Sequence, residues 1–97
     1  MKPSDRLNAH RQAIRDTISR FNAANPRVFG SVARGEDRED SDLDILVDDL
    51  AGSTLLTLGG LQDALERLLE GTSIHLVTPG DIPVDVSPRI FREARPI

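Results

Sequence analysis

The sequence predicts a single small α/β domain, of the α+β type, in which helices flank a small mixed or mostly antiparallel sheet. The chain has 97 residues, which is the size of one domain. Apolar residues recur at helical spacing in two long segments, and three short runs rich in β-favouring residues lie between and after them. We therefore expect one domain that spans residues 1–97, in which helices and strands alternate.

The first expected element is a helix that Ser4 or Asp5 could cap and that ends near Asn25. Its shared apolar face consists of Leu7, Ile14, Ile18 and Phe21. Four arginines lie largely off that face, namely Arg6, Arg11, Arg15 and Arg20. We interpret them as a solvated basic face, with a docking surface for an acidic partner as the alternative.

A short apolar strand at residues 27–29 runs into Gly30 and Ser31, and a helical turn is expected from Val32 until Gly35 stops it. Gly30 would let a phosphate approach the backbone closely. The Ser31 hydroxyl and the first free N–H groups of the turn could donate to its oxygens. Gly30 and Ser31 are therefore candidate phosphate-binding residues.

Two carboxylates follow on the next expected strand, at residues 41–48. Residues two apart on a strand point to the same side, so Asp42 and Asp44 project together while Leu43 and Ile45 face the other way. Two carboxylates this close repel each other unless a cation compensates them. Because the ligands are oxygen only, Mg²⁺ or Mn²⁺ fits best, with substrate phosphates completing its ligands. The acids of the preceding loop, residues 36–40, are expected to be exposed.

The second half of the chain predicts one long helix, one strand and one short helix. The long helix covers residues 54–70, and its apolar stripe is Leu58, Leu61, Leu65, Leu68 and Leu69. Gly59 and Gly60 weaken its first half, so we expect a kink there or a helix that starts near Leu61. A strand is expected at residues 72–78 and a short helix at residues 87–94.

Composition restricts the function and the location of the protein. A net charge of −4 and only three aromatic residues argue against general nucleic-acid binding. Cysteine is absent, and no signal peptide or membrane-spanning apolar run is found, so we expect a cytoplasmic protein that does not act at a membrane. The core of so small a domain is modest, and association into a homo-oligomer or hetero-oligomer would bury more surface.

The run GSVARGEDREDSDLDILVD resembles the nucleotidyltransferase superfamily that includes DNA polymerase beta and kanamycin nucleotidyltransferase, most closely its minimal nucleotidyltransferases. The order of the expected elements follows that family over nearly the whole chain. The resemblance implies the nucleotidyltransferase fold and Mg-ATP as substrate. It also implies transfer of AMP to a hydroxyl, with Asp42 and Asp44 as catalytic metal ligands. From toxin-paired members it implies a tyrosine of a HEPN-family toxin as acceptor, and hence an antitoxin role.

His75 is where the chain departs from that family, in which a third carboxylate commonly faces the other two from this strand. A neutral imidazole could act as the general base or as a metal ligand, although Mg²⁺ prefers oxygen. It could equally fill the position through a hydrogen bond to a neighbour. Two alternatives therefore stay open beside the enzyme that modifies a toxin. One is a catalytically impaired module that binds nucleotide or protein, and the other is a nucleotidyltransferase with a different acceptor.

Overall fold

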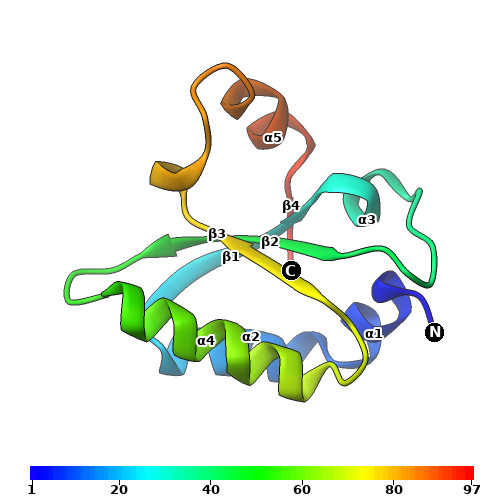
Figure 1. Cartoon of the computed structure of the whole chain (residues 1–97), viewed down its shortest axis with the longest axis horizontal. Coiled ribbons are helices and arrows are strands. Elements are labelled where there is room, and N and C mark those ends of the chain that lie inside the picture. The colour runs from blue at the N-terminus through cyan, green and yellow to red at the C-terminus, as the bar shows by residue number, and fades with distance from the viewer.

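A computed structural model, which describes all residues 1–97, places a four-stranded sheet between helices on both of its faces (Figure 1). The strand order is β3-β2-β1-β4. Strand β1 pairs antiparallel with β2 and β4, and β2 pairs parallel with β3. This small mixed sheet with its flanking helices confirms the predicted fold class.

The elements follow one another along the chain with short connections. In order they are α1 (Pro3–Ala9), α2 (Arg11–Arg20), β1 (Ala23–Phe29), α3 (Gly30–Arg34), β2 (Leu43–Asp49), α4 (Leu55–Leu68), β3 (Ile74–Val77), a 3₁₀ turn (Pro79–Asp81), α5 (Ser87–Glu93) and β4 (Arg95–Pro96). None of these helices has both the length and the apolar character that crossing a bilayer requires.

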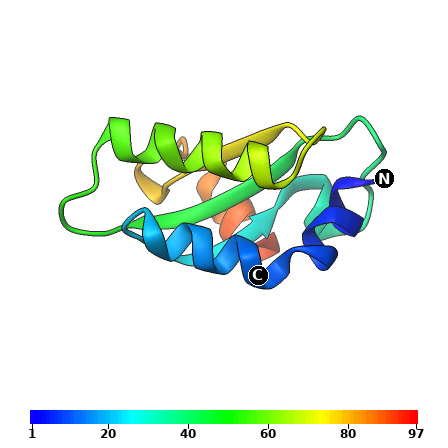
Figure 2. The same cartoon turned by 90° about the horizontal axis from the view of Figure 1, so that it is seen from below.

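The main core lies between the sheet and the helix pair α2 and α4, which run side by side across one face of the sheet (Figure 2). Its fully buried members are Ile14, Ile18, Leu43, Ile45, Val47, Leu61, Leu65 and Leu69. The alternation predicted for β2 is therefore confirmed on its apolar side, because Leu43 and Ile45 both point into this core. Of the predicted leucine stripe, Leu61, Leu65 and Leu69 are in this core and Leu68 packs against it, whereas Leu58 is not part of it.

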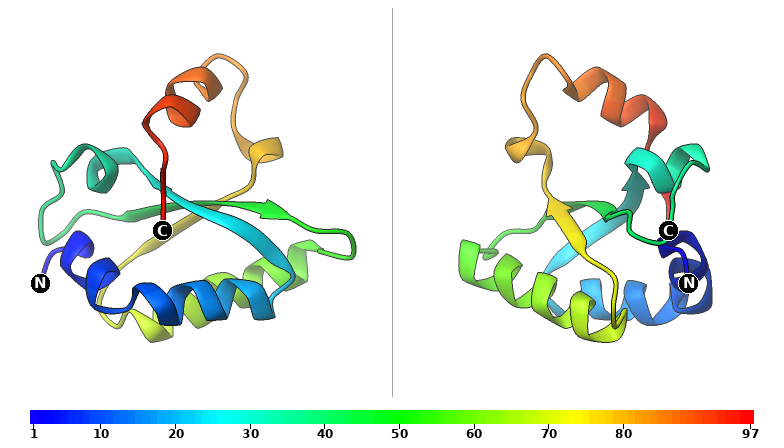
Figure 3. Two further views of the ribbon diagram at one scale, coloured as in Figure 1. Left: turned by 180° about the vertical axis from the view of Figure 1, so that it is seen from behind. Right: turned by 45° about the vertical axis from the view of Figure 1, so that its right-hand side comes forward.

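The opposite face of the sheet is covered by α5 and the chain that leads to it (Figure 3). A smaller apolar cluster of Phe29, Leu46 and Ile82 lies there, and Ile90 of α5 packs against it. Strand β4 then returns the chain to the free edge of β1, where the Ile97 N–H donates to the Pro26 carbonyl at 3.0 Å. These contacts fix α5 above the end of β1, next to Gly30.

The prediction of one long first helix is wrong in two places. The helix is interrupted at His10, and the second part ends at Arg20 instead of near Asn25. Ala23 already pairs with Asp49 in the sheet, so strand pairing overrides the local helix preference of this segment. Neither Ser4 nor Asp5 caps α1, because Lys2 occupies the N-cap position.

Two expectations about glycines and acids are also corrected. Helix α4 begins at Leu55 and continues through Gly59 and Gly60. A Cβ on Gly60 would lie 3.1 Å from the ring of Phe21, so this glycine allows α2 and α4 to pack closely.

In the loop before β2, Asp37 is buried instead of exposed. Its carboxylate accepts the Ser4 backbone N–H at 2.9 Å, which gives the first turn of α1 an acceptor from outside the helix.

Candidate functional site

The predicted phosphate-binding and metal-binding residues line one pocket at the end of the sheet. The pocket has a volume of about 380 Å³ and lies between α3, the start of β2 and one side of α5. Gly30, Ser31, Asp42 and Asp44 all contribute to its wall. Ser31 and Asp42, which have ten residues between them in the sequence, are brought together because Phe29, which precedes Gly30, pairs with Asp44 across the two strands.

Gly30 lies against Asp44 so closely that no side chain fits between them. A Cβ at Gly30 would collide with the Asp44 carboxylate oxygen Oδ2. Gly30 also has a φ of +72°, a backbone conformation that costs other residues free energy. Glycine is therefore required here for two reasons: the positive φ disfavours other residues, and the Asp44 carboxylate leaves no space for a side chain. The helical turn starts at Gly30 itself, two residues earlier than predicted.

The two aspartates differ in their surroundings. Asp42 is exposed just before β2, whereas the side chain of Asp44 is only 20% exposed. Burial raises the pKa of Asp44, and the negative charge of Asp42 acts in the same direction, while His75 opposes both. Two carboxylates that share a pocket and offer only oxygen ligands match the donor set of a hard divalent cation. Asp42 and Asp44 therefore fit Mg²⁺ or Mn²⁺.

His75 lies on β3 beside Asp44, its partner across the parallel strands. Its Nδ1 is 3.1 Å from Asp44 Oδ1, and its side chain is 60% exposed. With the proton on Nδ1, the imidazole donates to the carboxylate and keeps Nε2 as an acceptor toward solvent. His75 thus contacts the predicted site but does not line the pocket. Asp81, the next acid along the chain after His75, does not line the pocket either. It caps the turn after β3, where its carboxylate accepts the Thr78 N–H at 3.2 Å.

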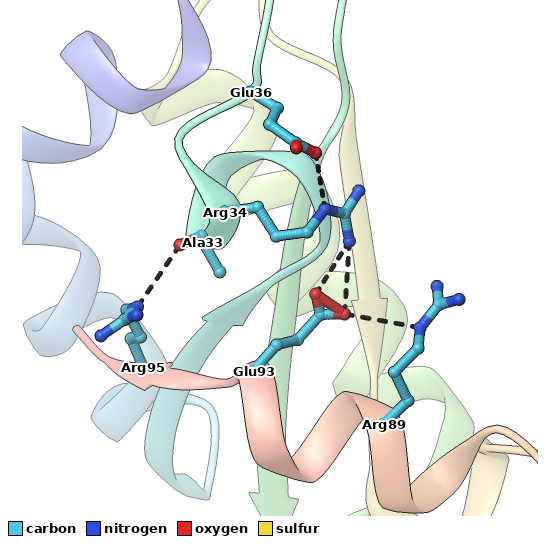
Figure 4. Close-up of polar contacts among 6 residues, drawn as sticks. All are labelled: Ala33, Arg34, Glu36, Arg89, Glu93 and Arg95. Carbon is cyan, nitrogen blue, oxygen red and sulfur yellow. Dashed lines mark hydrogen bonds and ion pairs between the residues drawn. The ribbon is translucent and has the colours of Figure 1, made fainter.

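Sequence reasoning missed the wall of the pocket that α5 supplies. Arg89, Ile90 and Glu93 line it from this helix, and Arg34 lines it from α3. Glu93 accepts from Arg34 Nη1 at 2.8 Å, and Glu36 accepts from Arg34 Nε at the same distance (Figure 4). These carboxylates raise the pKa of the Arg34 guanidinium. The one available signal was the spacing of Arg89 and Glu93, four residues apart on one helix face.

Comparison with known proteins identifies similar sequences over most of the chain. The family model described as "Nucleotidyltransferase domain" matches residues 10–97. The protein adenylyltransferase MntA of Thermococcus cleftensis is 39% identical over 87 residues, which cover 90% of this chain and 84% of that protein. A candidate protein adenylyltransferase of Methanocaldococcus jannaschii is 34% identical, over 91% of this chain and 94% of its own length.

Solved structures give the same result for the fold. A structure described as a candidate minimal nucleotidyltransferase superposes with a TM-score of 0.86 at 44% identity, covering 97% of this chain and 95% of that one. A toxin–antitoxin crystal structure with AMP-PNP superposes with a TM-score of 0.69 at 18% identity, covering 97% of this chain and 71% of that one. At that identity the second likeness concerns the fold alone.

Proposed function

Since the chain belongs to the nucleotidyltransferase domain family, we propose that it transfers AMP from ATP to a hydroxyl group of a protein. In this proposal Gly30 and Ser31 bind the phosphates, and Asp42 and Asp44 hold Mg²⁺ or Mn²⁺. The observation that carries the proposal is the contact of Gly30 with Asp44, because the proposed phosphate-binding residue then adjoins one of the two proposed metal ligands, and all four residues line one pocket. A metal held by those carboxylates would reach the same phosphates.

The reaction forms one bond and breaks one at the α-phosphorus. The acceptor oxygen attacks this atom, the bond to the oxygen that bridges the α- and β-phosphates breaks, and pyrophosphate leaves. The bound cation would neutralise negative charge on the α-phosphate and the leaving group. Gly30 leaves room for the phosphates, and the Ser31 hydroxyl donates to one of their oxygens.

His75 is the residue next to the site that can accept the proton of the attacking hydroxyl. Its Nδ1 contact with Asp44, at 3.1 Å, orients the ring, and Nε2 is then available as the base. The opposite assignment, in which His75 only fills the position of a missing carboxylate, gives a module that binds nucleotide and partner without turnover. What favours this second candidate is that the imidazole brings no negative charge to the cation and lies outside the pocket lining.

The proposed acceptor is a tyrosine of a HEPN-family toxin, so that the protein acts as the antitoxin of a cytoplasmic pair. The relatives named protein adenylyltransferases support an acceptor that is a protein. The net charge of −4 favours a protein acceptor over general nucleic-acid binding. Under this proposal residues 1–97 act as one minimal nucleotidyltransferase domain within a complex of the two proteins.

Incubation of the protein with ATP, Mg²⁺ and the toxin encoded beside it tests both candidates. Mass spectrometry of the toxin should show an added AMP on a tyrosine, and the Asp42→Asn/Asp44→Asn variant should show none. His75→Ala should abolish the modification if His75 is the base, whereas His10→Ala serves as the matched histidine control away from the pocket. If neither wild type nor His75→Ala modifies the toxin and both still bind ATP, the binding module is correct. Full activity of His75→Ala would mean that the base lies elsewhere.

A further inference from the structure

Three arginines gather beside the pocket, where α3 and α5 contact each other. Arg34 comes from α3, and Arg89 and Arg92 come from α5; we call these three residues the α5 rim. Together with Glu93 they line a second cavity, of about 450 Å³. No hydrophobic residue contributes to its wall. Such a concentration of guanidinium groups is notable in a chain whose net charge is −4.

The rim cavity adjoins the nucleotide pocket. Arg34, Arg89 and Glu93 line both, so that an extended ligand could pass from one into the other. Figure 4 shows the carboxylate of Glu93 between the guanidinium groups of Arg34 and Arg89. Gly30, Ser31 and the two aspartates line the pocket but not the rim cavity. The two regions therefore present opposite charges to a ligand that spans them.

The arginines of the rim are held to different degrees. Arg34 is fixed by two carboxylates, through Nε to Glu36 and through Nη1 to Glu93, both at 2.8 Å. Arg89 approaches Glu93 only to 3.9 Å, and its side chain is 73% exposed. Arg92 makes no ion pair within the chain. Three guanidinium groups thus face two carboxylates, and the donors of Arg89 and Arg92 are largely free to bind an anion.

The charges of the residues that line the two cavities indicate which anion the rim arginines would bind. A nucleoside triphosphate that enters a site with two aspartates and one divalent cation has most of its own negative charge left uncompensated. No lysine lines either cavity, and the rim arginines are the cationic side chains that do. Arginine also matches phosphate oxygens in a bidentate geometry.

We propose that the α5 rim is an anion subsite that binds the pyrophosphate end of the nucleoside triphosphate, with Arg89 and Arg92 as its main ligands. This inference rests on the proposed function, and it adds a role for the terminal helix. Arg34, fixed by Glu36 and Glu93, marks the boundary between the two parts of the site. The α-phosphate then lies nearer to Asp42 and Asp44, where the transfer takes place.

The test compares ligands with and without a terminal pyrophosphate. Arg89→Gln/Arg92→Gln should weaken calorimetric binding of Mg-ATP and of inorganic pyrophosphate by about tenfold or more, since each charged hydrogen bond lost is worth about tenfold or more. Binding of AMP, which does not reach the rim, should change by less than about twofold. The matched control is Arg15→Gln/Arg67→Gln, which removes two exposed arginines from the helices on the other face of the sheet and should leave all three affinities unchanged.

Several results would overturn the subsite. They are an unchanged Mg-ATP affinity, an equal loss for AMP and ATP, or an equal loss in the control variant. A loss of toxin modification with unchanged ATP affinity would assign the rim to the acceptor, which also contradicts the proposal. If wild type binds pyrophosphate through the rim but does not bind ATP, the proposed function fails while the anion subsite stands. The two claims are therefore distinguishable.

Discussion

The two faces of strand β2 differ sharply in what they carry, although they belong to the same seven residues. Toward α2 and α4 the strand presents Leu43, Ile45 and Val47, which have no exposed surface. Toward α5 it presents Asp44, Leu46 and Asp48, of which the two aspartates are partly exposed and hydrogen-bonded to other elements. Alternation along one strand thus separates the residues that stabilise the domain from those that we assign to its chemistry.

A change in the core between the sheet and helices α2 and α4 should have the largest effect on stability and a small effect on the candidate site. Leu65→Ala removes a fully buried side chain from α4 and leaves a cavity against the sheet. We expect the free energy of unfolding to fall by about 2–5 kcal/mol, as measured by urea denaturation. The affinity of the folded fraction for Mg-ATP should stay the same. A loss of stability below about 1 kcal/mol would show that α4 does not carry the core in this way.

The next effect concerns Gly30, and Gly35 offers a matched control. Both glycines have a positive φ, of 72° and 73°, so the backbone strain of alanine at either position should cost about 1 kcal/mol of stability. A Cβ at Gly30 meets Asp44, whereas a Cβ at Gly35 meets nothing within 4 Å. Gly30→Ala should therefore lose nucleotide binding in a calorimetric titration, while Gly35→Ala should bind as wild type does. Equal ATP affinities in the two variants would mean that the Gly30 contact is only part of a turn.

The smallest of these effects is at Asp37, far from the pocket, and it depends on pH. Burial acts to raise the pKa of Asp37, but hydrogen bonds from Ser4 outweigh it and the pKa is lowered. A lowered folded pKa gives stability that is present above the unfolded value of about 3.9 and is lost as the pH falls through the folded value. Asp37→Asn should cost about 0.3–1 kcal/mol at neutral pH, and this difference should shrink in acid.

Thermal unfolding followed from neutral to acid pH measures the Asp37 contribution, with Asp40→Asn, at an exposed position of the same loop, as the control. Asp40 makes no hydrogen bond or ion pair in the structure, so its variant should follow the wild-type profile. A difference between Asp37→Asn and wild type that grows toward acid pH would contradict the assigned direction of the pKa shift.

Features with a local period could be predicted from the sequence, and features set by distant contacts could not. The alternation at Asp42 and Asp44 and the leucine stripe of α4 follow from the geometry of one element each. The contact of Glu93 with Arg34 joins residues 59 positions apart, and no local pattern specifies it. The same holds for Asp37 at the start of α1 and for the pairing of Ala23 that ends the helical segment early. The glycine–aspartate pocket was thus foreseeable, whereas its α5 wall was not.

The Asp42→Asn/Asp44→Asn variant tests most directly whether the two aspartates at the start of β2 belong to a metal-nucleotide site. Calorimetric titration with Mg-ATP should show binding by the wild type and none by this variant. Its free energy of unfolding without metal should be unchanged or higher, because two repelling carboxylates are removed. The matched control, Asp16→Asn/Asp63→Asn on α2 and α4, should bind as wild type does. Equal ATP affinity in wild type and in the Asp42→Asn/Asp44→Asn variant would contradict the account.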